Sequence, residues 1–141
     1  MPTPTIDKAV IRPLPLFSSL ADAELDDVLA GAVSRRVAQG EAVFEQGQPA
    51  SNFYVLLHGR LKVHQVTPAG QQVIVRIVNP GDLFGIAKAL RRTDYPGTAI
   101  AAADSVVLTW PMERWDPLIA AHPSLALGVM HTVGARLQDA H

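Results

Sequence analysis

The chain has 141 residues, of which 48% are hydrophobic, and it carries a formal net charge of -1. This length and composition describe one globular domain with a core of its own and exclude a disordered protein, while the 12 basic and 13 acidic residues, spread evenly, give no basic face for nucleic acid. Cysteine is absent, which excludes disulfide bonds, zinc–thiolate sites and cysteine-ligated iron–sulfur clusters.

The first 15 residues hold four of the eleven prolines and show little apolar periodicity, which predicts a loosely ordered arm. Ile6, Val10 and Ile11 could pack on the domain, and a helical turn can form there. The N-terminus lacks a basic-then-apolar signal segment, and no apolar run approaches the ~20 residues that cross a bilayer. We therefore expect a cytoplasmic protein without a membrane partner.

Helical periodicity begins after the arm. Apolar residues between Leu20 and Leu29 recur at the spacing of one helix face, with acidic residues between them. Ser19 or Asp22 can cap such a helix. The pattern predicts an amphipathic helix over residues 22–30.

The pattern then changes from helical to alternating. Five short segments are rich in Val, Leu and aromatic residues, and glycines separate them at intervals of mostly eleven or twelve. Short strands at this spacing predict an antiparallel sandwich or barrel, with Gly59 and Gly70 at hairpin turns. The segments are residues 33–38, 42–46, 52–59, 60–66 and 71–78.

The stretch NPGDLFGIAKALRRTDYPGTAIAA, residues 79–102, reads as strand, turn, short helix, loop and strand. Pro80 and Gly81 end one strand, residues 86–90 can form a short helical turn, and residues 98–100 begin another strand. A short helix held between two strands presents unpaired backbone N–H groups, which favours binding of an anion or a small ligand.

The C-terminal third predicts one more strand and two helices. Residues 104–110 read as the strand, and residues 112–123 as a short helix with Trp115, Leu118 and Ile119 on one side. The last helix starts at Pro123 and carries apolar residues at intervals of 3 and 4, which is typical of a coiled-coil seam between two copies. The alternative is a helix that packs on its own β-roll. The seam residues are Ala126, Val129, Met130, Val133 and Leu137.

Residues 79–102 resemble the phosphate-binding cassette of the cyclic-nucleotide-binding domain in Crp/Fnr-type bacterial transcription regulators, and the resemblance extends from about Leu16 to the C-terminus. It implies a mainly β fold with flanking helices, in which an antiparallel double-stranded β-helix, or jelly roll, precedes a long C-terminal dimerisation helix. The implied divisions are a flexible arm over 1–15, a sensor roll over 16–122 and a dimerisation helix over 123–141. In this family a DNA-binding helix-turn-helix domain follows, so we expect a truncated chain that binds DNA only through a missing C-terminal domain.

The cassette departs from the family pattern at its ligand anchors. Members that bind cyclic AMP read G-D-x-x-G-E-L and, further along, R-S/T-A, where the Glu binds the ribose hydroxyl and the Arg and its neighbour bind the cyclic phosphate. This sequence keeps the two glycines and the aspartate, but it has Ile86 at the Glu position, Pro96 at the Arg position and Gly97 at the hydroxyl position. Losing a charge-assisted anchor typically costs about 2–5 kcal/mol, so we expect physiological cyclic AMP binding to be lost.

An alternative interpretation is a cyclic-nucleotide-binding module with an altered cassette, in which Arg91 or Arg92 supplies the missing charge. In either case the resemblance implies that a small-molecule or gas effector enters near the cassette and changes the pairing of the last helices in a homodimer. The candidate ligand-binding residues are Gly81, Asp82, Leu83, Phe84, Gly85, Ile86, Tyr95, Pro96, Gly97 and Thr98.

Over most of its length the chain looks most like the Dnr/NnrR branch, whose members regulate nitrate and nitrite respiration. In that branch the effector is thought to be nitric oxide sensed through haem, and the cassette likewise lacks the Glu and the Arg. This resemblance implies haem as a candidate cofactor, with His131, one residue from the seam, as its candidate ligand. The remaining histidines read as exposed, capping or terminal residues: His58, His64, His122 and His141.

Catalytic and metal-binding patterns are absent from the sequence. No two histidines have the H-x-H spacing and downstream glutamate that a metalloenzyme on a cupin-like barrel needs. Neither a G-x-S-x-G elbow nor a P-loop occurs. We therefore expect no metal site and no enzymatic activity.

Overall fold

The computed structural model describes residues 8–127 and residue 130. Within this part of the chain, eight strands form the body of the domain, and short helices precede, interrupt and follow them. The elements are α1 (Lys8–Ile11), α2 (Asp22–Ala30), β1 (Val33–Val37), β2 (Ala42–Phe44), β3 (Asn52–His58), β4 (Leu61–Val66), β5 (Gln72–Val78), β6 (Leu83–Phe84), the 3₁₀ helix η1 (Ala87–Leu90), β7 (Thr98–Ala101), β8 (Ser105–Pro111), the 3₁₀ helix η2 (Met112–Arg114) and α3 (Trp115–Ala121).

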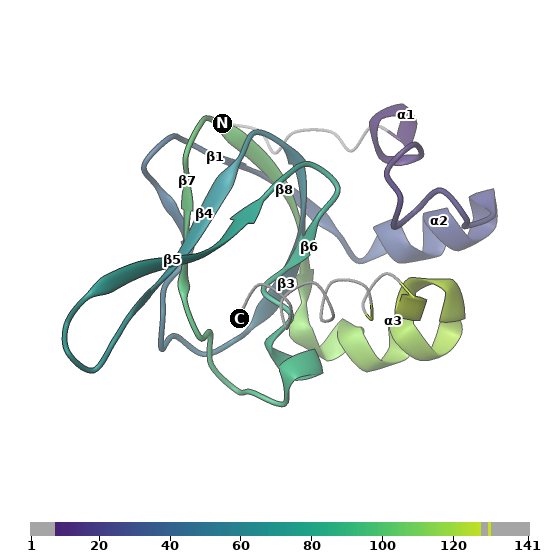
Figure 1. The fold of residues 1–141 in the computed structure, drawn as a ribbon. Coiled ribbons are helices and arrows are strands. Elements are labelled where there is room, and N and C mark those ends of the chain that lie inside the picture. The colour runs from purple at the N-terminus through teal and green to yellow at the C-terminus, as the bar shows by residue number, and fades with distance from the viewer. Residues whose placement is uncertain (1–7, 128–129, 131–141) are drawn as a thin grey trace.

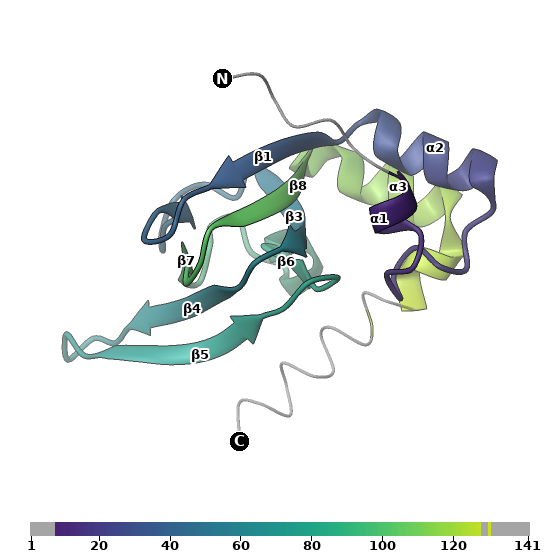
Figure 2. The ribbon, with the colours of Figure 1, turned by 90° about the horizontal axis from the view of Figure 1, so that it is seen from above.

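The strands form two antiparallel sheets of four strands each, and the three α-helices gather at one end of the roll (Figures 1 and 2). Sheet A has the strand order β1-β8-β3-β6, and sheet B has the order β2-β7-β4-β5. The first strand pairs with the eighth, the second with the seventh, the third with the sixth and the fourth with the fifth. This nested pairing is that of a jelly roll, so the predicted mainly β fold with flanking helices is confirmed.

The two central strands of sheet A, β3 and β8, are buried on both faces, because one face meets sheet B and the other meets the helices. The edge strand β1 leaves Val33, Arg35 and Arg36 exposed. Along β3, Phe53 belongs to a core shared with α2 and α3, whereas the next residue, Tyr54, belongs to the core between the two sheets. Successive side chains of a strand point to opposite faces. This explains why β3 is apolar at nearly every position rather than alternating. The two cores are called the helix-side core and the roll core below.

The predicted arm over residues 1–15 differs from the structure in its second half. Residue Ile11, at the end of α1, is fully buried, with 0% of its surface exposed. Leu14 packs against the helix-side core. Residues 8–15 are therefore part of the domain rather than a loose arm, because their apolar side chains find a place in that core, while residues 1–7 lie outside the described part.

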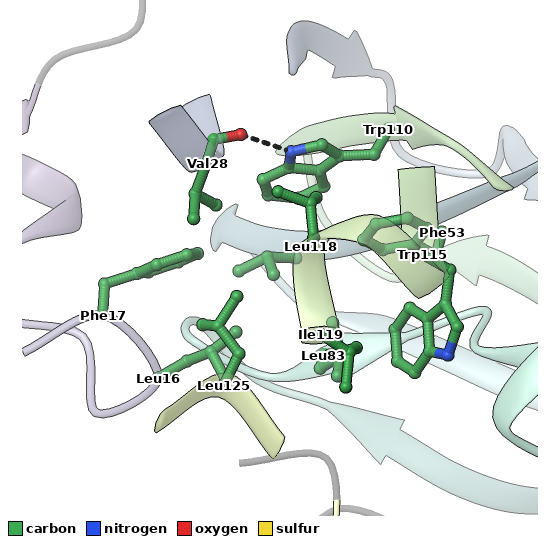
Figure 3. A pocket seen from close by; sticks show the side chains of 11 residues that line it. Leu16, Phe17, Val28, Phe53, Leu83, Trp110, Trp115, Leu118, Ile119 and Leu125 are labelled. Carbon is green, nitrogen blue, oxygen red and sulfur yellow. Dashed lines mark hydrogen bonds between the residues drawn. The ribbon is translucent and has the colours of Figure 1, made fainter. Parts of the chain in front are cut away.

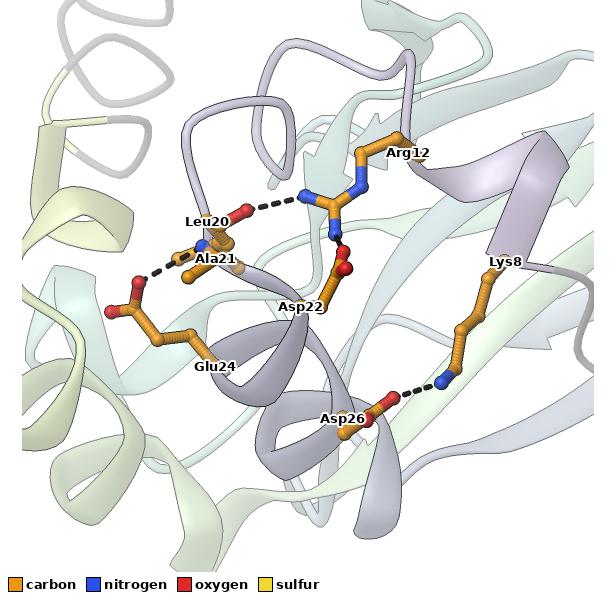
Figure 4. A network of polar contacts seen from close by, with 7 residues as sticks. All are labelled: Lys8, Arg12, Leu20, Ala21, Asp22, Glu24 and Asp26. Carbon is orange, nitrogen blue, oxygen red and sulfur yellow. Dashed lines mark hydrogen bonds and ion pairs between the residues drawn. The ribbon is translucent and has the colours of Figure 1, made fainter.

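The helix predicted over residues 22–30 forms with those bounds, but another residue closes its N-terminus. The carboxylate of Glu24 accepts a hydrogen bond from the backbone N–H of Ala21 (2.9 Å), and this bond lowers the pKa of Glu24. Asp22 instead pairs with Arg12, directly after α1 (Figure 4). The exposed ion pair contributes little stability by itself.

The last helix is described only at its start, where residues 123–127 and residue 130 have helical backbone. Leu125 is buried in the helix-side core, Ala126 is half-buried and Met130 is 69% exposed. The other residues of the predicted seam and the candidate haem ligand lie outside the described part: Val129, Val133, Leu137 and His131. The dimerisation helix therefore stays a prediction.

Candidate ligand-binding site

The cassette begins with a turn that hydrogen bonds hold against the end of β3. Gly81 has a φ of 92°, which favours glycine, and its N–H donates to the carbonyl of Leu56 (2.7 Å). The carboxylate of Asp82 accepts a hydrogen bond from the backbone N–H of Asn79 (2.8 Å). Gly81 and Asp82 thus shape the turn into β6.

Gly85 brings the backbone after β6 against two aromatic rings. It has a φ of 68°, and a Cβ atom there would lie 2.8 Å from Cδ2 of Tyr54 and 3.2 Å from Cε2 of Phe44. Only glycine fits without displacing a ring. The residues that follow form η1, within the short helix predicted over 86–90. Arg91, the residue directly after η1, has a φ of 57°.

A cavity of about 20 Å³ lies between η1, the loop before β7 and the strands β4 and β5. One water molecule needs about 10–15 Å³, so the cavity as it stands has room for a water or two and not for a nucleotide. Six of the ten predicted residues line it, namely Phe84, Gly85, Ile86, Tyr95, Pro96 and Gly97. The other four do not: Gly81, Asp82, Leu83 and Thr98.

β4 and β5 supply a wall of this cavity that could not be predicted from the sequence. Val63 and Gln65 stand two apart on β4 and therefore face the same side, and Arg76 of β5 joins them. The Nη2 atom of Arg76 donates a hydrogen bond to the carbonyl of Leu83 (2.8 Å). The alternation along β4 predicts which of its side chains face inward. Only the strand pairing shows that these side chains meet the cassette.

The two arginines proposed as substitute anchors are not among the residues that line the cavity. Arg91 and Arg92 are exposed, and Arg92 pairs with Asp94 at 3.0 Å. The geometry therefore gives no support to the altered cassette that would use them.

Two of the positions predicted to correspond to the family's anchors, Ile86 and Gly97, are tightly packed. Ile86 is 1% exposed and belongs to the helix-side core. At Gly97 a Cβ atom would lie 2.8 Å from the carbonyl oxygen of His64 and 3.0 Å from Cγ1 of Val63. A hydroxyl-bearing residue at position 97 would force the loop away from β4, so the phosphate anchor of the family has no room.

Tyr95 holds the loop before β7 against β3. Its hydroxyl donates to the carbonyl of Asn52 (2.6 Å) and accepts from the N–H of the same residue (3.1 Å). Its ring stacks on Phe44 with 3.9 Å between ring centroids. Burial raises the pKa of Tyr95 well above its usual range. Because its hydroxyl already makes these two hydrogen bonds, Tyr95 fixes the loop to β3 and has no free hydroxyl proton to offer a ligand.

Residues 34–122 match the family described as "Cyclic nucleotide-binding domain", and this match spans more than half of the chain. The chain belongs to that family. This cyclic nucleotide-binding domain is 29% identical over 126 residues to the Cyclic AMP receptor protein of Thermus thermophilus, covering 89% of the chain and 58% of that protein. Among solved structures it resembles the sensor domain of the transcriptional regulator DNR from Pseudomonas aeruginosa, with a TM-score of 0.76 and 27% identity over 92% of this chain and 87% of that one. The predicted resemblance to Crp/Fnr-type regulators is confirmed, and the DNR match agrees with the predicted branch.

The cyclic nucleotide-binding domain also occurs within larger proteins of another kind. It is 32% identical over 113 residues to human Patatin-like phospholipase domain-containing protein 6, a match that covers 75% of this chain but 8% of that protein. The matched family describes a binding domain and indicates no catalytic family for this chain. The chain spans 58% of the length of the Thermus relative.

The histidines of the described part differ in their surroundings. His58 is exposed and His64 is half-buried. His122 is 6% exposed, with Nε2 only 2.6 Å from a carboxylate oxygen of Asp27 and Nδ1 3.6 Å from one of Glu24. Its interpretation as a simple capping residue was incomplete, because its ring joins the end of α3 to α2.

Residues 8–127 and 130 hold no group of three or more metal-binding side chains placed to share an ion. The helices of this same part of the chain are too short or too polar to cross a membrane.

Proposed function

We propose that the chain is the effector-sensing and dimerisation part of a Crp/Fnr-type transcription regulator whose cassette does not bind cyclic AMP. The observation that carries this proposal is that the cassette keeps Gly81, Asp82 and Gly85 but has other residues at the positions of the ligand anchors. Ile86 packs into the helix-side core and cannot accept a hydrogen bond from a ribose, and Gly97 lies against β4. Pro96 offers neither a charge nor an N–H group to a phosphate. The likeness to the DNR sensor domain supports a sensing role in a bacterial transcription regulator, which we expect to act in the cytoplasm.

Side-chain contacts connect the cassette to the start of the last helix, so a displacement of the cassette can reach that helix. Nζ of Lys88, on η1, lies 2.6 Å from a carboxylate oxygen of Asp116, in the first turn of α3, but this exposed pair contributes little by itself. Ile86, directly before η1, lies in the helix-side core together with Leu118 of α3 and Leu125 of the last helix. α3 leads to His122, which contacts Asp27 on α2, and the last helix follows. An effector that displaces η1 would therefore move α3 and the start of the last helix, and in a dimer this would reposition DNA-binding domains further along the complete protein. A domain that stays monomeric by light scattering at high micromolar concentration would contradict this mechanism.

Titration calorimetry with millimolar cyclic AMP or cyclic GMP is expected to give no binding heat. Each missing charge-assisted anchor is worth about 2–5 kcal/mol, or roughly 30- to 4,000-fold in affinity. The matched control is the chain with Arg91→Ala and Arg92→Ala. Stoichiometric heat in the unchanged chain would overturn the proposal, and loss of that heat in the double variant would establish the altered cassette instead.

Nitric oxide sensed through haem is the effector that the Dnr/NnrR resemblance suggests, and it is a second candidate. The cassette cavity, at about 20 Å³, does not fit haem, and no histidine lines it. An open hollow on the outer face of sheet B includes His64 beside Lys62 and Ile74, on the opposite side of β4 from the cassette. An anaerobic haemin titration followed by visible absorption tests this candidate, with His64→Ala and His131→Ala as separate variants. The absence of stoichiometric binding would remove haem from consideration.

A further inference from the structure

A second cavity, of about 30 Å³, lies in the helix-side core between sheet A and the helices (Figure 3). Phe53, Leu83 and Trp110 form its wall on the sheet. Val28 of α2 and Leu118 of α3 form the wall on the helices. The cavity is thus lined by elements that are far apart in the sequence, so local sequence patterns do not predict it.

The lining of this cavity is entirely apolar in character. Every side chain in it is that of Leu, Ile, Val, Phe or Trp, so the indole nitrogens are its only polar side-chain atoms. Nε1 of Trp110 donates to the carbonyl of Val28 (2.8 Å), and the nitrogen of Trp115 lies on the side of its ring away from the other lining residues (Figure 3). A buried water needs two to four polar partners. A water molecule here would have none free, so the cavity favours an uncharged apolar occupant.

The size of the cavity limits that occupant to a few atoms. About 30 Å³ is roughly twice the space that one water requires and well below the ~150 Å³ of an apolar cavity that binds benzene. A diatomic molecule or a xenon atom fits these limits, whereas an aromatic ring does not. Leu16 and Ile119 are the partly exposed members of the lining, so entry from solvent is expected between them.

The cavity shares one strand with the cassette. On β6, Leu83 lines this cavity and the next residue, Phe84, lines the cassette cavity, because consecutive side chains of a strand point to opposite faces. Leu125, in the first turn of the last helix, lines the helix-side cavity as well. An occupant would therefore touch both β6 and the segment that begins the last helix.

We propose that the helix-side cavity is a ligand site for a small, uncharged, apolar molecule of about diatomic size, separate from the cassette. Filling it presses on Leu83 and Leu125 together and so changes the position of the last helix relative to β6. This signalling part rests on the proposed sensing function, whereas the binding part does not.

Xenon is the probe that tests the site. Methyl NMR spectra of the full 141-residue chain under increasing xenon pressure are expected to show saturable shifts at Val28, Leu118 and Leu125. Val28→Leu fills the cavity and is expected to reduce these shifts about tenfold or more. The matched control is Val63→Leu, which adds the same methylene at the cassette cavity and is expected to leave the shifts unchanged.

Each outcome decides one part of the proposal. Shifts that do not saturate, or that persist in a folded Val28→Leu variant, would overturn the site. If Val28→Leu does not fold, Leu16→Phe at the expected entrance takes its place, with the same expected loss. Saturable shifts at the wall residues, Leu125 included, without any change at Ser124, Ala126 or Leu127 would overturn the signalling. Binding of cyclic AMP in calorimetry would defeat the proposed function and leave the xenon result standing, so the two failures are distinguishable.

Discussion

Replacing Trp110 by alanine is expected to lower the free energy of unfolding by about 3–5 kcal/mol. The indole is 1% exposed and stacks on Phe53 with 5.3 Å between ring centroids. Its N–H is the hydrogen-bond donor to the carbonyl of Val28 on α2. The substitution therefore leaves both a void between sheet A and the helices and a buried carbonyl without its partner. Urea denaturation followed by circular dichroism measures the loss.

The variant Trp110→Phe separates the two contributions. It keeps most of the apolar volume but removes the N–H group, so an expected loss of about 1–3 kcal/mol reports mainly the unpaired carbonyl of Val28. The further loss in Trp110→Ala then reports the void. Equal losses for the two variants would contradict a role for the ring's bulk in joining the helices to the roll.

Replacing Gly85 by alanine is expected to lower the free energy of unfolding by about 2–5 kcal/mol. The left-handed backbone costs about 1–2 kcal/mol for a residue with a Cβ atom. Crowding adds about 1–3 kcal/mol, because that atom would lie 2.8 Å from the ring of Tyr54. Chemical denaturation measures the sum.

Gly70→Ala is the matched control for this crowding. Gly70 has a φ of 83°, but no atom lies within 4 Å of the place where a Cβ atom would be. It is therefore expected to lose only the 1–2 kcal/mol of the backbone conformation. If both variants lose the same amount, the cassette backbone does not lie as close to the roll core as the structure places it.

The secondary structure of this chain could be predicted well because its signals are local. The helix over residues 22–30 has the predicted bounds, and each of the five predicted strand segments contains an observed strand. The helical period of 3.6 residues, the strand period of 2 residues and turn glycines such as Gly59 can all be recognised from neighbouring residues alone. The cassette was recognisable for the same reason, and six of its ten candidate residues line a cavity.

The prediction that the cassette lacks its anchors could also be made from the sequence alone, since Ile86 and Pro96 can be read directly. The sequence did not show what fills their places, because the closeness of Gly97 to His64 depends on the pairing of β7 with β4. The strand order, the wall from β4 and β5, and the burial of Ile11 depend in the same way on contacts between distant segments. Local periodicity states which face of an element is apolar. Only the tertiary structure decides what that face meets, because the free energy of burial depends on the partner surface and not on its position in the sequence.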